Sequence, residues 1–140
     1  MITGVKINEV QAKRDSEDMI TNMKFNINFD DVKINGENVE VMYTFVATYE
    51  SGEAPKAKQI GELKIIGTIL SKENKKDSDE ISSVWKSKKT LPLAFAENII
   101  NLLNFECGAR GTLLASSIGL LAPIPLSRAK LQETPAGKSA

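Results

Sequence analysis

Apolar and polar residues alternate strictly over positions 21–29 of the chain. The odd positions carry large apolar side chains, and these are Met23, Phe25, Ile27 and Phe29, whereas the even positions carry asparagine or lysine. Successive side chains of a strand point to opposite faces of a sheet, so this pattern predicts a strand with one buried face.

The apolar residues move to even positions after Asp30-Asp31, at Val32 and Ile34, just before Asn35-Gly36. Asn-Gly between two alternating segments is the strongest short-range signal for a β-hairpin. A two-residue turn at Asn35-Gly36 would place Val32 opposite Val39. One extra residue at Asp30-Asp31, a β-bulge, then restores one common buried face. The expected pairs are Phe29 with Val41, Ile27 with Tyr43, and Phe25 with Phe45.

Four strands are expected in all, over Ile2–Lys13, Met19–Ile34, Glu37–Glu50 and Lys58–Leu70. In the third strand the odd positions form the buried face. The fourth strand is apolar on both faces, with Ile60, Ile66 and Leu70 opposite Leu63, Ile65 and Ile69, so we expect it to be covered on both sides.

Two helices follow the strands. The charged stretch Ser71–Lys89 carries Ile81, Val84 and Trp85 at the spacing of one helical face, which predicts a short amphipathic helix. A longer helix is expected from Pro92, since proline suits the first turn. Its apolar residues surround the whole helix, so it needs burial on more than one side. We expect Gly108 and Gly111 to end or interrupt it.

The remaining residues complete an α+β domain over residues 1–131. Pro123 and Pro125 exclude a helix over Leu121–Leu126, which should be extended, and a last short helix is possible over Ser127–Leu131. Residues 132–140 are polar and are expected to form a flexible tail.

The composition restricts the classes of partner and the cellular compartment that we expect. The chain has 140 residues, 18 Lys and Arg against 18 Asp and Glu, one cysteine and no histidine. Balanced charge favours neither nucleic acid nor an anionic membrane as a partner. Thr112–Leu121 is apolar but too short to cross a bilayer, so no membrane insertion is expected. One cysteine and no signal-peptide pattern at the start favour the cytoplasm.

The absence of histidine argues against an enzyme. It removes the usual general base, the Ser-His and Cys-His nucleophile pairs and most zinc sites. We therefore expect no catalytic residue, no metal site and no cofactor. Cys107 lies in a mixed field of Glu106 and Arg110, and is expected to be a buried, unreactive thiol.

The order of these elements resembles the SecB family of export chaperones. Short motifs carry the resemblance at matching places, namely Ala96-Glu97 in the long helix, Arg110-Gly111-Thr112 at its end, and Leu121-Ala122-Pro123-Ile124 beyond. The resemblance implies a four-stranded antiparallel sheet with a long and a shorter helix packed on one face. It also implies a homotetramer, built as a dimer of dimers, whose hydrophobic grooves hold unfolded polypeptides without ATP.

Two features depart from the bacterial members of that family. The spacings from Glu97 to Arg110 and from Thr112 to Leu121 are longer, and the chain is neutral where those members are strongly acidic and dock a translocation motor through that charge. Docking to such a motor is therefore not expected here.

Large apolar side chains are the candidates for binding clients, which would be non-native or pre-export polypeptides. The candidate client-binding residues are Met42, Tyr43, Tyr49, Trp85, Phe95 and Ile124. For Tyr43, Tyr49 and Phe95, ordinary burial preferences favour the alternative that they are core between sheet and helix. Trp85 lies in the charged connector, so partial exposure is expected there, with binding and local packing both open.

Self-association into a dimer or tetramer is expected through the less polar sheet face and the long helix. The candidate interface residues are Val46, Ile66, Ile99 and Leu103, and the alternative for the sheet face is single β-branched residues exposed to water. The predicted function is an ATP-independent holdase. A hydrophobic small-ligand binder and a dedicated chaperone of one partner, such as an antitoxin, remain as alternatives.

Overall fold

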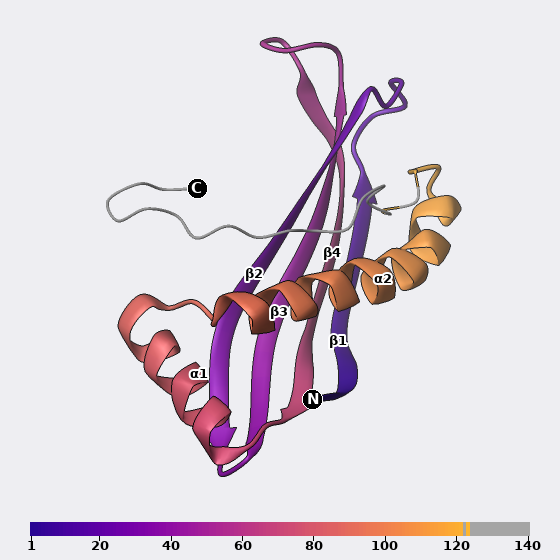
Figure 1. The fold of residues 1–140 in the computed structure, drawn as a ribbon. Helices are drawn as coiled ribbons and strands as arrows, with labels where there is room; N and C mark the ends of the chain where they lie inside the picture. Colours follow the sequence, from indigo (N-terminus) through magenta and orange to yellow (C-terminus); the bar gives the residue numbers. More distant parts are fainter. Residues whose placement is uncertain (122, 124–140) are drawn as a thin grey trace.

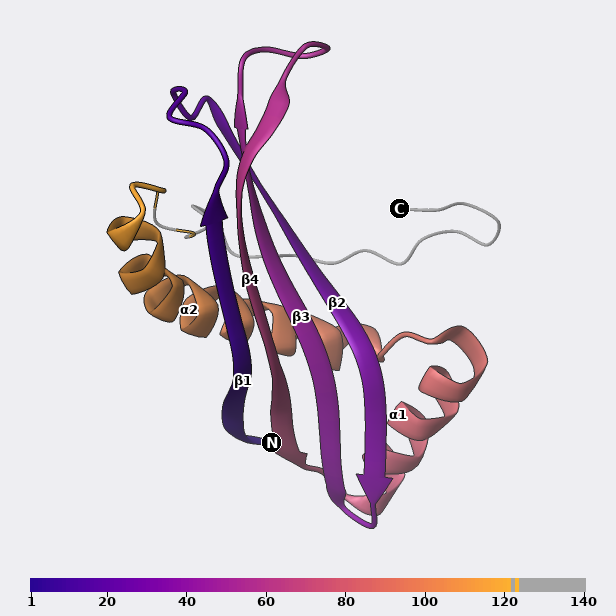
Figure 2. The same cartoon turned by 180° about the vertical axis from the view of Figure 1, so that it is seen from behind.

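The chain forms a four-stranded antiparallel sheet with two helices packed on one face (Figure 1 and Figure 2). The computed structural model describes residues 1–121 and 123. The strands are β1 (Ile2–Arg14), β2 (Asn22–Asn35), β3 (Asn38–Ser51) and β4 (Lys58–Lys72). The helices are α1 (Lys75–Lys88) and α2 (Leu93–Ser117). The predicted α+β class is confirmed.

The strand order is β1-β4-β3-β2, so the first two strands of the chain form the two edges of the sheet. β3 and β4 lie in the centre and are paired on both sides. Figure 1 shows α2 crossing the sheet from the β2 side to the β1 side, with α1 beside the lower end of β2. This order matters because central and edge strands bury their inner faces to different extents.

The hairpin between β2 and β3 turns one residue later than predicted. Asn35 pairs with Asn38, so Gly36 and Glu37 form the turn, and Gly36 has φ +64°. A positive φ at the first central residue is typical of a type II′ turn and favours glycine there. Val32 consequently pairs with Val41, not with Val39.

The predicted bulge is confirmed between Phe29 and Asp31. The Thr44 hydroxyl donates a hydrogen bond of 2.6 Å to the carboxylate of Asp30 at this point. The predicted partners beyond the bulge are wrong by two residues, because the turn is displaced: the pairs are Phe29 with Tyr43, Ile27 with Phe45, and Phe25 with Ala47. A shift of two residues keeps every side chain on its face, so the buried face itself is as predicted.

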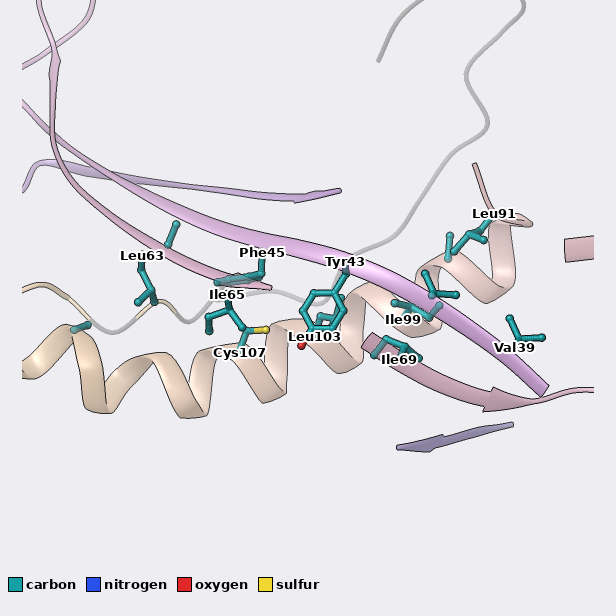
Figure 3. Close-up of a cluster of buried hydrophobic side chains, with 14 of the residues drawn as sticks. Val39, Tyr43, Phe45, Leu63, Ile65, Ile69, Leu91, Ile99, Leu103 and Cys107 are labelled. Atoms are coloured by element: carbon teal, nitrogen blue, oxygen red, sulfur yellow. The ribbon is translucent and has the colours of Figure 1, made fainter. Parts of the chain in front are cut away.

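The core lies between β3, β4 and the sheet-facing side of α2 (Figure 3). Every odd residue of β3 from Val39 to Tyr49 is buried, as expected. The buried side chains of α2 that meet them are Ala96, Ile99, Leu103, Cys107 and Ala115.

Helix α2 runs through Gly108 and Gly111 without interruption, so the expectation that they end it is wrong. Both are buried. A Cβ on Gly111 would lie 2.6 Å from Cδ2 of Leu63 and 2.7 Å from Cγ of Pro123. Gly111 therefore permits close approach of α2 to β4, and the helix tolerates the weak propensity of glycine because its other residues are buried.

The helices cover one face of β4, and the other face, which was also expected to be covered, is partly open in the protomer. Ile66 and Leu70 are half-exposed on the face opposite the helices. Ile60, grouped with them from the sequence, is fully buried. The register shifts between the pairs Tyr49–Gly61 and Glu50–Gln59, so Ile60 is the extra residue of a bulge and turns to the inner face.

The helix ends are tied to the sheet and to their own side chains. Asn74 caps α1 by accepting a 2.8 Å hydrogen bond from the amide of Asp77. Arg14 at the end of β1 donates to the carbonyl of Gly119 just after α2, at 2.5 Å. Neither helix in the described part of the chain is long and apolar enough to span a membrane. The predicted helix over Ser127–Leu131 and the predicted tail lie outside the described residues.

Candidate functional site

Tyr43 and Tyr49, two candidate client-binding residues, belong to the core. Both are fully buried, which confirms the core interpretation of these two side chains. The Tyr43 hydroxyl donates to the carbonyl of Lys6, at 3.2 Å, and the Tyr49 hydroxyl donates to the carbonyl of Leu121, at 2.6 Å. Burial raises the pKa of Tyr49 to about 12, and raises that of Tyr43 further. Neither ring is available to a polypeptide at the surface.

Trp85 is also in the core, so the expected partial exposure is wrong. It is 9% exposed, on the buried face of α1 with Ile81. The ammonium group of Lys89 lies 5.5 Å from the centre of the indole ring and covers its outer side. Trp85 lies in a charged stretch of the sequence, but the charged side chains of that stretch lie on the exposed face of α1 and Trp85 lies on its buried face.

Phe95 and Met42 are the two candidates that remain partly open. Phe95, in the first turn of α2, is half-buried against the core. Met42 is half-buried on the outer face of β3, away from the helices. The structure thus places these two on opposite faces of the sheet and does not bring them into one groove. Ile124, the last candidate, lies outside the described residues.

The inner face of β2 is only partly covered on the helix side of the sheet, as is that of β1, the other edge strand. Met23, Phe25, Ile27 and Phe29, which we call the β2 strip, pack against the core but stay half-exposed. Their partners on β3 are fully buried. The Phe25 ring lies 6.1 Å from that of Phe45, so one edge of the strip is fixed to the core.

The β2 strip was predicted as a buried face, and its open character was missed. The alternation shows which side chains point inward, but not whether the strand lies at an edge of the sheet. The even positions held a signal, since asparagine is depleted in strands, and three of the four between Asn22 and Asn28 are asparagine. Such a strand suits an edge better than a centre.

A hollow of about 860 Å³ lies between α1 and the start of α2. Its apolar walls include Val84, Leu91 and Phe95, and its rim includes Asp77, Glu80 and Lys88. Mixed charges at the rim and an apolar wall are suited to a peptide or another partly apolar ligand. Among the described residues, no three metal-ligating side chains come together.

The candidate interface residues divide into two pairs. Val46 and Ile66 are half-exposed on the outer sheet face, where a second copy could reach them. Ile99 and Leu103 are fully buried under α2 (Figure 3). The interface prediction is therefore corrected for Ile99 and Leu103, which face the sheet of their own protomer.

The opposite side of α2 carries an exposed apolar stripe. Phe105 is 72% exposed and Leu113 is 77% exposed, with exposed Ala109 midway between them. We call these three residues the α2 stripe. Residues four apart lie above one another on a helix, so the α2 stripe is continuous. The all-round apolar character of the helix indicated a second buried side, but the sequence did not show which residues form it.

The arrangement of these elements matches that of a solved protein. The structure of the Mycobacterium tuberculosis Rv1957 SecB-like chaperone, in complex with a ChAD peptide from the Rv1956 HigA1 antitoxin, superposes with a TM-score of 0.55. The match covers 96% of this chain and 91% of that chain, at 11% sequence identity. The chain has a SecB-like fold. No protein-family model and no curated protein matches its sequence.

The SecB-like fold confirms the resemblance found in the sequence at the level of architecture. At 11% identity the likeness shows the fold alone. The open apolar surfaces of this chain are the β2 strip, the α2 stripe and the outer sheet face.

Proposed function

We propose that this chain is an ATP-independent chaperone that holds non-native polypeptides on the β2 strip. The observation that carries the proposal is the contrast between two neighbouring strands. The inner residues of β3 are 0–1% exposed, whereas Met23, Phe25, Ile27 and Phe29 on β2 stay half-exposed. An apolar surface at a sheet edge accepts an extended chain without requiring a defined sequence.

The proposed site is matched to a short extended segment. The four residues span six steps along the strand, about 20 Å at 3.3 Å per residue. Completing the burial of four partly covered apolar side chains contributes about 1–4 kcal/mol before the cost of association. About 4 kcal/mol corresponds to a millimolar dissociation constant, so one strip alone binds weakly.

Because one β2 strip binds a client only weakly, we propose that the chain also self-associates. Several strips in one assembly bind one long client with far higher avidity than each does alone. The α2 stripe fits a twofold contact centred on Ala109, because antiparallel packing would set Phe105 of one copy against the partner's Leu113. Val46 and Ile66 on the outer sheet face offer a second contact surface, as a dimer or tetramer requires.

One observation favours a narrower client range. The solved SecB-like chaperone with this fold was bound to a peptide from an antitoxin. A dedicated chaperone would bind one partner at least about tenfold more tightly than an unrelated unfolded chain, a difference of about 1.4 kcal/mol. The chain has 18 basic and 18 acidic residues and so has no net acidic charge with which to dock a translocation motor. We therefore propose no role in export.

The test is retention of an unfolded model protein. The chain is mixed with a reduced, unfolded protein without nucleotide, and the mixture is analysed by size-exclusion chromatography with light scattering. We expect an oligomer that retains the unfolded client and does not retain the same client when folded. A monomer that never retains unfolded protein would overturn the proposal. A lipid or metabolite retained in native mass spectrometry, in that case, would support the small-ligand alternative, with the hollow beside α1 as its site.

A further inference from the structure

The chain returns to the inner face of the sheet after α2. Gly119, with φ +72°, ends the helix, and the Leu120 side chain packs over Gly61 of β4. The carbonyl of Leu121 accepts the hydrogen bond from Tyr49, and Pro123 is fully buried. The chain is therefore anchored on the helix-covered face up to residue 123.

This anchor lies close to the β2 strip. Pro123 and Leu63 both crowd the position of Gly111. Leu63 pairs with Ala47, and Ala47 pairs with Phe25, so these three residues form one row across the sheet. The row spans two strand spacings, about 10 Å. Three residues of extended chain also span about 10 Å, which brings Leu126 within reach of Phe25.

The sequence after the anchor suits an extended contact. Ile124 and Leu126 are separated by Pro125, which cannot continue a helix and favours extended backbone before it. Residues two apart in an extended chain point to the same side. Two apolar side chains therefore follow the anchor with the period that matches an edge strand.

We propose that the segment Ile124–Leu126 occupies the β2 strip of its own protomer when no client is bound, and competes with clients for it. This inference rests on the proposed function of the strip. A short tether gives the segment a millimolar effective concentration, so a contact too weak to form between separate molecules still occupies the strip for part of the time. A half-occupied site lowers the apparent client affinity about twofold, and a longer client displaces the segment readily.

A cysteine pair in the full-length chain tests the contact. The double variant Ile27→Cys with Leu126→Cys is oxidised mildly at high dilution, and the matched control is Asn28→Cys with Leu126→Cys, because Asn28 points to the opposite face. The native Cys107 is buried and present in both. We expect an intramolecular disulfide in the first variant at least about tenfold faster than in the control, and slower formation with excess unfolded client. Equal rates, or mainly intermolecular bridges, would overturn the inference.

A second variant separates this inference from the proposed function. Leu126→Asp should raise client affinity by about twofold or more, whereas Thr134→Asp, outside the segment, should not change it. Normal client binding with an unaltered affinity in Leu126→Asp counts against the competing segment alone. A rapid 27–126 disulfide in a chain that binds no client supports the contact but rejects the proposed function.

Discussion

Tyr43 stands directly opposite Gly67 in the β3–β4 ladder, and its ring crosses the position of a side chain at residue 67. The Tyr43 oxygen lies 2.6 Å from where a Cβ on Gly67 would be. Its hydroxyl bonds to Lys6 on β1, so one side chain from β3 reaches two strands away across β4. Tyr49 pairs with Gly61 in the same ladder, but there the Leu120 side chain lies nearest to the glycine. The Tyr43 ring thus covers a glycine of the neighbouring strand, which restores packing where that strand lacks a side chain.

Gly67→Ala should destabilise the fold strongly. The added Cβ would lie 2.0 Å from the carbonyl oxygen of Lys6, and backbone cannot move away cheaply. We expect the free energy of unfolding in urea to fall by about 3 kcal/mol, at the upper end for overpacked cores. Gly4→Ala is the control, since its nearest neighbour is a Leu70 methyl at 3.7 Å, and it should change stability by less than about 1 kcal/mol. Equal effects of the two changes would contradict this account of the tyrosine contact.

Gly111→Ala should also destabilise, although alanine is the better helix former. On an exposed helix position the change would stabilise by about 1 kcal/mol. At Gly111 the new methyl meets Leu63 and Pro123, which should outweigh that gain and give a net loss of about 1–2 kcal/mol. Asn98→Gly compared with Asn98→Ala, at an exposed position of α2 outside the α2 stripe, measures helix propensity and should cost about 1 kcal/mol. If Gly111→Ala raises the thermal midpoint, close packing of α2 on β4 does not require this glycine.

The Cys107 thiol should make stability fall above pH 9. Burial raises its pKa to about 12 in the folded chain, so the unfolded chain loses this proton first as pH rises. The unfolded state then binds fewer protons, and the free energy of unfolding declines by up to about 1.4 kcal/mol per pH unit for this group. Urea unfolding from pH 7 to 10 should show a smaller decline in Cys107→Ala. A thiol reagent at pH 8 should react only on unfolding, and rapid labelling of the native chain would contradict its burial.

Local patterns of the sequence predict the strands, the helices and their inner faces. They do not predict how far a face is buried, because that depends on whether the strand is central or at an edge of the sheet. The alternation of β3 and the bulge at Asp30-Asp31 follow from local parity, which neighbouring strands cannot change without burying polar residues. The hairpin turn was misplaced by one residue because Asn35-Gly36 and Gly36-Glu37 are both compatible with positive φ at Gly36.

The candidate site depended on information that is not local. Tyr43 and Phe25 have similar patterns around them, yet one is buried and the other half-exposed because β3 is central and β2 is an edge. The β1–β4 pairing that sets this order joins distant segments. Gly111 shows the same limit, since a glycine in an apolar helix indicates either an end or a close approach, and only the position of Leu63 decides between them.

Polar substitution in the β2 strip should weaken client binding in a chain that still folds. Ile27→Asn removes one of four apolar contacts, worth about 1 kcal/mol, so we expect client affinity to fall about fivefold. Ile27 is partly buried against the core, so the free energy of unfolding in urea is measured as well, and affinity is compared at a temperature where both chains are folded. Asn26→Asp, on the opposite face of the same strand, is the control and should leave affinity unchanged. Fluorescence anisotropy with a labelled unfolded client measures both, and equal affinities would place the client elsewhere.

Charge in the α2 stripe should dissociate the oligomer. Two lysines, Phe105→Lys with Leu113→Lys, would meet each other across the proposed twofold contact and remove its largest apolar side chains. We expect light scattering to report a smaller assembly with an unchanged protomer fold by circular dichroism. Ser83→Lys, at an exposed position of α1, adds the same side chain away from the stripe and should leave the mass unaltered.

Because one strip binds weakly, the smaller assembly should also lose affinity for a long unfolded client, which needs several strips. Its affinity for a short peptide, which needs only one strip, should not change. An assembly that keeps its mass with both lysines present would show that α2 is not the contact, and would leave the outer sheet face at Val46 and Ile66 as the surface to test.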